Sequence, residues 1–343
     1  MSTIVHIGLG KTATTSLQEN VFPEIPKLRK QIKYNEQEIR HSIRKLWFFD
    51  NKSDEELNFQ KKILEQKHFI SLEYLVNWNP RIWEKTADLN LRLFGKDAII
   101  IITARDTESF LRSIYQQRIH EGNICAPEEF FVNKDDYNKL KPLLSEKILT
   151  HFDVDSYDLE KLFHIYNSRF SKVYLVPLSS IDSLEFLRET FDLNENEIEN
   201  LRKNFKKKRY NKAYSKIAMV LTMFVQKILM TIGLTLRGSD KSIFDSFNTG
   251  YKSKMFDSRA FAELSFLEKI KEFPQRSIKR IISSFGWRFL MQSVVNRVLP
   301  YKKYELPENI YRNVELARKN DMFLSKFEIN KQILEKKSKS IKI

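Results

Sequence analysis

The sequence predicts a three-layer α/β/α fold with a central parallel sheet, followed by a mostly helical C-terminal part. Two patterns predict it. Over residues 1–195, short β-branched runs alternate with segments of helical periodicity, which is typical of parallel strands joined by right-handed crossovers. Over residues 196–343, strand patterns disappear and the chain becomes helical and basic. We expect a single domain over 1–343, in which residues 1–195 form the α/β core.

The expected elements follow one another in a regular order. Strands are expected at residues 3–8, 68–72, 97–104 and 172–178, and helices at 14–21, 107–122, 155–170 and 183–191. The helix over 107–122 has Asp106 or Thr107 as its N-cap and Gly122 beyond its C-terminus. We expect the four strands to form one parallel sheet, because a helix between two strands allows the second strand to run in the same direction as the first.

The composition favours an anionic partner and a reducing compartment. The chain of 343 residues has a formal net charge of +15, which favours nucleic acid, acidic membrane surfaces, or phosphorylated and sulfated small molecules as partners. Cys125 is the single cysteine, which excludes an internal disulfide, and no Cys/His spacing fits a zinc site. The first residues form a strand rather than a secretory signal, so we expect a cytoplasmic protein. The lack of a zinc-like Cys/His spacing leads us to expect no metal.

The most apolar stretch covers residues 217–236 and is the one candidate for a membrane span. Gln226 and Lys227 lie near its middle, and a lysine at the centre of a spanning helix costs about 3 kcal/mol. The stretch therefore predicts a buried or interfacial helix, and we keep peripheral membrane contact as an alternative.

A loop follows the first strand at residues 8–18, "GLGKTATTSLQ", and matches a nucleotide-binding loop only in part. The pattern G-x-x-x-x-G-K-[ST] would need glycine where the chain has Val5. A strand-to-helix turn nevertheless gathers backbone N–H groups that suit a phosphate. Lys11 adds a positive charge, and hydroxyl donors come from Thr12, Thr14, Thr15 and Ser16. The alternative is a polar helix cap with a solvated lysine.

Arg105 and Ser113 form a second candidate group. Arg105 follows the strand over 97–104, and Ser113 lies in the next helix. Ligands of open parallel sheets bind beyond the carboxyl ends of the strands, so Arg105 and the Lys11 loop should face the same crevice. The alternative for Arg105 is a structural ion pair.

Together these two segments resemble the sulfotransferases that use 3′-phosphoadenosine 5′-phosphosulfate (PAPS), which have a P-loop NTPase-like fold. The family's loop core, K-[TS]-[GA]-T-[TS], is matched by Lys11 to Thr15, and its arginine and serine eight residues apart are matched by Arg105 and Ser113. The resemblance implies PAPS as co-substrate and no metal. The implied nucleotide-binding residues are Gly10, Lys11, Thr12, Ala13, Thr14, Thr15, Ser16, Arg105 and Ser113, with Arg209 and Asn211 from the basic run over 202–212.

The reaction implied by this resemblance is in-line displacement of the sulfuryl group onto an acceptor hydroxyl or, less favoured, an amine. Lys11 would neutralise the leaving phosphate oxygen. Glu73 follows the strand over 68–72 and is the first candidate for the general base, with His120 and His6 as alternates. We expect His6, which lies within a strand, to be a packed core histidine. The similarity to carbohydrate-type members implies a carbohydrate or glycolipid acceptor.

Two other functions remain as alternatives. One is a Mg²⁺-dependent P-loop kinase or triphosphatase with a degenerate loop, although no strand-terminal aspartate is evident. The other is a basic nucleic-acid-binding protein, which we disfavour because no aromatic-basic platform or helix-turn-helix pattern is present. The basic run over 202–212 fits a solvated helix face, a clamp on the nucleotide, or a groove for an anionic glycan or lipid.

Overall fold

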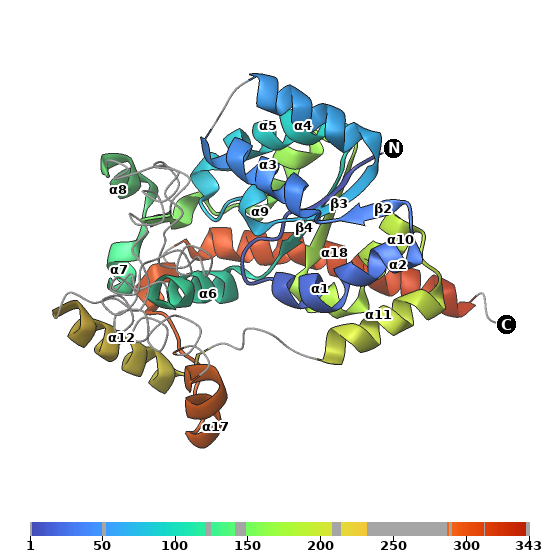
Figure 1. Ribbon diagram of the computed structural model, residues 1–343. Helices are drawn as coiled ribbons and strands as arrows, with labels where there is room; N and C mark the ends of the chain where they lie inside the picture. Colours follow the sequence, from blue (N-terminus) through green and yellow to red (C-terminus); the bar gives the residue numbers. More distant parts are fainter. Residues whose placement is uncertain are drawn as a thin grey trace, which may run out of the picture.

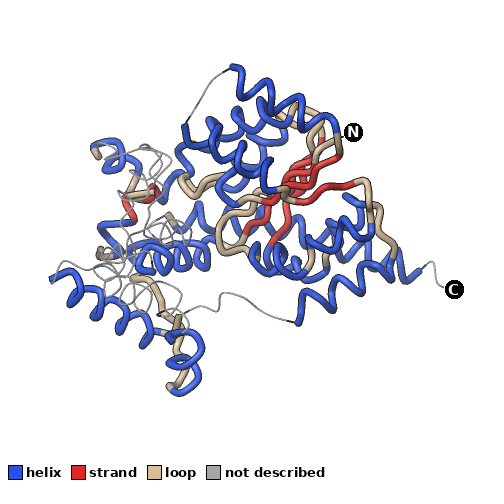
Figure 2. The backbone as a smooth tube through the Cα atoms, viewed as in Figure 1, coloured by secondary structure: helices blue, strands red, loops and turns tan. Residues whose placement is uncertain are grey.

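A computed structural model confirms the α/β fold with its central parallel sheet. It describes residues 2–49, 53–120, 125–140, 149–207, 214–231, 287, 290–311 and 313–340. Five strands form the sheet in the order β2-β3-β1-β4-β7, and each neighbouring pair is parallel. The strands are β1 (Ile4–His6), β2 (Ile32–Tyr34), β3 (Lys67–Ser71), β4 (Ile99–Ala104) and β7 (Lys172–Pro177). Figure 2 shows them gathered at the centre, with helices on both sides.

The sheet separates two hydrophobic layers because successive residues of a strand point to opposite faces. On one face, Val5 and Ile100 pack with α3 (Gln37–Phe49), α4 (Ser53–Glu65), α5 (Trp83–Phe94) and α9 (Leu159–Asn167). On the other face, Ile4 and Ile101 pack with α1 (Thr14–Asn20), α2 (Ile25–Leu28), α10 (Glu185–Phe191) and α11 (Glu195–Lys207). The three layers are visible in Figure 1. Helices on both faces explain why the strand sequences are apolar without alternation.

The edge strand β2 was not predicted from the sequence. Its three residues pair with β3 in parallel, and only Ile32 is fully buried. So short a run carries no strand periodicity, and its place is decided by pairing with β3. The four predicted strands and the four predicted helices are all present, within a few residues of their expected ends.

Helices from the second half of the chain pack against elements of the first half. Helix α6 (Thr107–His120) follows β4, and α12 (Lys216–Thr231) packs against α6. A π-helical segment η6 (Leu290–Val295) contacts α12, and the short α17 (Asn296–Val298) follows η6. The long α18 (Val314–Ser340) contacts β7, α9 and α6. A small separate sheet pairs β5 (Phe131–Val132) with β6 (Phe152–Asp153), next to α7 (Pro127–Phe130) and α8 (Lys134–Lys139).

The apolar stretch over 217–236 falls largely on α12, and residues 232–236 lie outside the described part of the chain. Within the described residues, no helix has the length and apolar character needed to cross a membrane.

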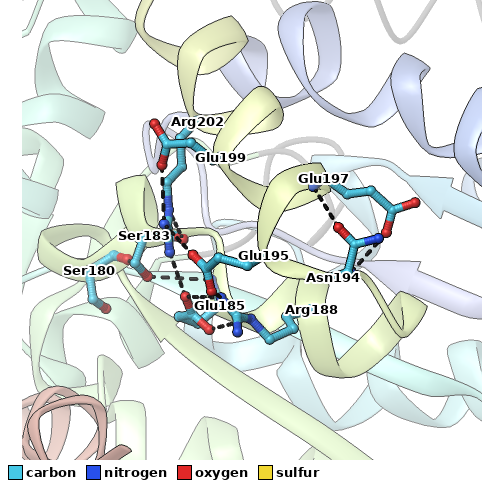
Figure 3. A network of polar contacts seen from close by, with 9 residues as sticks. All are labelled: Ser180, Ser183, Glu185, Arg188, Asn194, Glu195, Glu197, Glu199 and Arg202. Carbon is cyan, nitrogen blue, oxygen red and sulfur yellow. Dashed lines mark hydrogen bonds and ion pairs between the residues drawn. The ribbon is translucent and has the colours of Figure 1, made fainter. Parts of the chain in front are cut away.

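Arg202, the first residue of the basic run, holds α11 against α10. It pairs with Glu185 at 2.5 Å and with Glu195 at 3.3 Å, and it donates to the Ser183 carbonyl at 2.8 Å. Arg188 joins the same acidic pair, as Figure 3 shows. This part of the run is therefore a structural ion-pair network. The exposed lysines of α11 are Lys203, Lys206 and Lys207, and residues 208–213 lie outside the described chain.

Candidate functional site

The loop between β1 and α1 has an unusual backbone. Lys11 has a φ of 68° and Ala13 a φ of 59°, both in the left-handed region. Left-handed residues other than glycine each cost about 1–2 kcal/mol, so the surrounding contacts must hold this shape. Turns of this kind direct neighbouring N–H groups to one side and form anion-binding nests. Ala13 is also the N-cap of α1, and it makes no side-chain hydrogen bond that caps the helix.

Two glycines are required by close contacts rather than by their φ angles. A Cβ atom at Gly10 would lie 2.2–2.3 Å from three ring atoms of Trp78, so the indole lies directly against the loop backbone. A Cβ atom at Gly8 would lie 2.3 Å from Thr14 Cγ2 and 2.6 Å from Thr103 Oγ1. The loop is therefore packed on one side by Trp78 and on the other by β4 and the start of α1.

A chain of buried polar side chains runs beneath the loop and joins three strands. Ser71 Oγ lies 2.8 Å from His6 Nδ1, and Thr103 Oγ1 lies 3.3 Å from His6 Nε2. Thr103 Oγ1 is 2.7 Å from Thr12 Oγ1, which donates to the Leu9 carbonyl at 2.5 Å. At the other end, Gln18 Nε2 donates to Ser71 Oγ at 2.9 Å.

The donor and acceptor of each hydrogen bond in this series can be assigned by starting from the Leu9 carbonyl. The Leu9 carbonyl can only accept, so Thr12 uses its single hydroxyl proton there and must accept from Thr103. Thr103 in turn accepts from His6 Nε2–H, and Nδ1 accepts from Ser71. His6 is thus the neutral Nε2–H tautomer, and its complete burial lowers its pKa to about 3. The expected core position of His6 is confirmed.

Thr12 belongs to the structure of the loop. Its side chain is completely buried and its hydroxyl proton is directed to Leu9, beneath the loop, which differs from the expected hydroxyl donor to a phosphate. Any contribution of Thr12 to anion binding comes from its backbone N–H group.

Glu73 lies beside the loop, just beyond the carboxyl end of β3. Its carboxylate accepts a hydrogen bond from Thr14 Oγ1, at the first residue of α1. Burial raises the pKa of Glu73 above its ordinary value, and the positive charge of Lys11 opposes that rise. Lys11 and Glu73 are therefore close enough to influence each other's charge, although 62 residues separate them in the sequence.

Arg105 reaches the same loop from the end of β4. Its Nη1 donates to the Lys11 carbonyl at 3.0 Å, while its buried Nε has no hydrogen-bond partner among the described residues. Burial lowers the pKa of the guanidinium, which still remains protonated at neutral pH. Arg105 therefore both fixes the left-handed Lys11 and brings a permanent positive charge to the loop.

The structure brings together Lys11, Thr14, Glu73 and Arg105, and the remaining candidates outside the loop are Ser113, His120, Arg209 and Asn211. Ser113 lies on α6 and makes no hydrogen bond to these four within the described chain. The backbone of His120 ends α6, roughly 20 Å from the start of that helix at its usual rise, so His120 is not placed at the loop. The His120 side chain, Arg209 and Asn211 lie outside the described part.

Sequence reasoning missed the residues that support the loop. Gln18, Ser71, Thr103 and Trp78 each contact it or its buried polar chain, but they come from three different parts of the sequence. The available signal was the polar residue at or near the end of each strand, since such ends meet at one edge of a parallel sheet.

Comparisons with known proteins add a distant similarity. No protein-family model matches the chain, and no curated protein matches it. Among solved structures, the chain is similar to a sulfotransferase from Alicyclobacillus acidocaldarius, with 14% sequence identity and a TM-score of 0.35, covering 71% of this chain and 98% of that chain. So distant a similarity does not assign the chain to a family, and the function must rest on the site.

The described residues contain no group of three or more His, Cys, Asp or Glu side chains suited to a metal ion.

Proposed function

We propose that this protein is a sulfotransferase that moves a sulfuryl group from PAPS to an acceptor hydroxyl. The observation that carries the proposal is the meeting of Lys11, Glu73 and Arg105 at one sheet edge, after β1, β3 and β4. Two cationic side chains and one carboxylate of raised pKa are the groups that such a transfer needs. The sequence match of Lys11 to Thr15 supports the same reaction.

The loop fits the phosphosulfate end of the donor. Its left-handed residues form a turn suited to an anion, and Lys11 places a positive charge on the same turn. The unpartnered Nε of Arg105 is a donor that the described protein atoms do not satisfy, and a buried donor of this kind usually has a partner. Lys11 would stabilise the negative charge that develops on the departing phosphate oxygen.

Glu73 is the proposed general base. In the transfer, the bond from sulfur to the phosphate oxygen breaks while a bond from sulfur to the acceptor oxygen forms, and the acceptor proton passes to Glu73. Burial raises the pKa of Glu73, which makes the ionised carboxylate a stronger base than an exposed glutamate. Thr14 holds one carboxylate oxygen, so the other oxygen is left for the acceptor hydroxyl.

The acceptor is proposed to be a carbohydrate or glycolipid hydroxyl, on the family resemblance. Arg105, at the end of β4, would bind the 3′-phosphate of the donor. Ser113 would donate a hydrogen bond to the same phosphate if the bound nucleotide extends along α6. The reaction needs no metal, because Lys11 and the backbone N–H groups of the loop can neutralise the charge on a single phosphosulfate.

Calorimetric titration with 3′-phosphoadenosine 5′-phosphate, in EDTA, tests the donor site. We expect metal-free binding that Arg105→Ala weakens about tenfold to a hundredfold, since a charged hydrogen bond to phosphate is worth about 1.5–3 kcal/mol. Lys11→Ala should weaken binding similarly. The matched control is Lys96→Ala, because Lys96 is exposed at a turn before β4, and it should bind as the unaltered protein does.

The same titration with ATP and Mg²⁺ separates the alternative enzyme. Binding of ATP that requires Mg²⁺, without binding of the adenosine bisphosphate, would refute the sulfotransferase and favour a kinase. If the bisphosphate binds, transfer from ³⁵S-labelled PAPS to a panel of sugars and glycolipids follows, and Glu73→Gln should abolish transfer while leaving bisphosphate binding within about twofold.

A further inference from the structure

Helix α12 turns its more apolar face outward. Ile217, Val220, Leu221, Phe224 and Ile228 are all exposed, and Phe224 retains 62% of its accessible surface. Successive positions are three or four residues apart, with Val220 and Leu221 adjacent, so all five lie along one side of the helix. Helices on the surface of a globular protein normally direct such a stripe to the core.

The inward face of α12 makes specific hydrogen bonds to other segments, so the outward stripe is not a misplaced core. Gln226 Nε2 donates to the Ile119 carbonyl of α6 at 2.5 Å. Thr222 donates to the Ala218 carbonyl at 2.7 Å and accepts from Trp287 Nε1 at 3.0 Å. Rotating the helix to bury Phe224 would expose these partners, so the helix is held in its present orientation.

A second apolar stripe lies on the neighbouring segment. Leu290, Val294 and Val298 of η6 and α17 are exposed at successive spacings of four residues, and Val298 retains 75% of its accessible surface. Helix α12 contacts η6 directly. In Figure 1, α12 and α17 lie at the periphery of the molecule, away from the sheet. We call the exposed residues of the two stripes the apolar rim: Ile217, Val220, Leu221, Phe224, Ile228, Leu290, Val294 and Val298.

The charged residues that the structure describes within α12 and within residues 290–303 are all cations. Lys216 and Lys227 are exposed on the same flank of the α12 stripe, because eleven residues are close to three full turns. Arg297, Lys302 and Lys303 are exposed beside the second stripe, although Lys303 also approaches Glu108 at 3.5 Å. The sequence contains no Asp or Glu over residues 200–239 or 273–304. A ligand for this surface should therefore be apolar at its centre and anionic at its edge.

We propose that the apolar rim docks on the surface of an anionic lipid membrane. An apolar stripe flanked by lysines is the pattern of a helix that lies in the membrane interface, with lysine stems along the acyl chains and ammonium groups at the headgroups. A second copy of this chain fits less well, because pairing two rims would bring cations against cations. The surface is separate from the Lys11 loop, so the proposal does not depend on the sulfotransferase activity.

Co-sedimentation of the full chain with sucrose-loaded vesicles, without any sulfuryl donor, tests the proposal. The vesicles are phosphatidylcholine alone or with phosphatidylglycerol. We expect partitioning only into the anionic vesicles, weakened by salt. Phe224→Glu should reduce partitioning at least about tenfold, given the apolar area of one phenylalanine. The double variant Lys216→Gln, Lys227→Gln should reduce it about twenty-five-fold, near fivefold for each lysine.

Two matched variants make the result specific. Met322→Glu changes an equally exposed apolar residue on α18, and Lys96→Gln with Lys203→Gln removes two exposed lysines elsewhere. Both should sediment as the unaltered protein does. The proposal would be overturned if the protein did not partition into anionic vesicles, or if the control variants partitioned as weakly as the rim variants. It would also be overturned by a dimer that depends on Phe224 and forms equally with and without lipid. Light scattering of the same samples detects the dimer.

Discussion

His6 provides the sharpest test of the buried chain under the loop. The folded protein keeps this histidine neutral, with its pKa lowered from 6.5 to about 3 by burial. The unfolded chain therefore binds one more proton than the folded chain between these values. Folding stability must then fall as the pH is lowered from 7 toward 3, since protonation favours the unfolded state.

The size of this effect follows from the two pKa values. Lowering the pH from 7 to 5 should cost about 2 kcal/mol through His6 alone, because one pKa unit corresponds to about 1.4 kcal/mol. Other titrating groups add their own slopes, so the quantity of interest is the difference between the unaltered protein and His6→Gln. That variant lacks the titrating ring and should lose about 2 kcal/mol less over the same interval.

Urea denaturation at pH 7 and pH 5 measures the difference. The control is Asn167→Gln, which changes an exposed residue without a titrating side chain at the end of α9 and should keep the slope of the unaltered protein. Long-range ¹⁵N–¹H spectra of the unaltered protein should show the neutral Nε2–H tautomer of His6 at both pH values. Equal pH slopes for the unaltered protein and His6→Gln, or a protonated His6 at pH 5, would refute the reasoning.

Four further predictions concern the loop and Glu73. Gly10→Ala should destabilise the protein by about 1–3 kcal/mol through the contact with Trp78, and urea denaturation should show a smaller penalty in a Trp78→Ala background. Ala13→Gly should raise stability by about 0.5–1 kcal/mol because it removes a left-handed Cβ, whereas Ala87→Gly in the buried part of α5 should lower it. Lys11→Met should raise the pKa of Glu73 further, since Lys11 opposes the effect of burial; a fall of that pKa in ¹³C titration would contradict the structure. Because the pKa of Glu73 is raised on folding, stability should decline as the pH rises above 4.5 through the folded value, and Glu73→Gln should remove that decline.

The local features of the fold were accessible from the sequence. Apolar β-branched runs such as residues 97–104 indicate buried strands by composition alone, and the loop at residues 8–18 is recognisable by its glycines, lysine and hydroxyls. Because consecutive parallel strands end at the same edge, the placement of Glu73 and Arg105 near that loop was also predictable. These inferences need only local periodicity and one topological rule.

The contacts at the loop were decided by the tertiary structure. The hydrogen bond from Arg105 to the Lys11 carbonyl and the packing of Trp78 on Gly10 depend on which strands are neighbours. The register of β1 with β3 and β4 sets His6 between Ser71 and Thr103, and a shift of one residue would turn the imidazole to the other face of the sheet. Which residues reach this edge can be inferred from the order of strands and loops in the sequence. Only the folded structure decided their partners, because hydrogen bonds between distant residues are selected by register and packing rather than by local propensity.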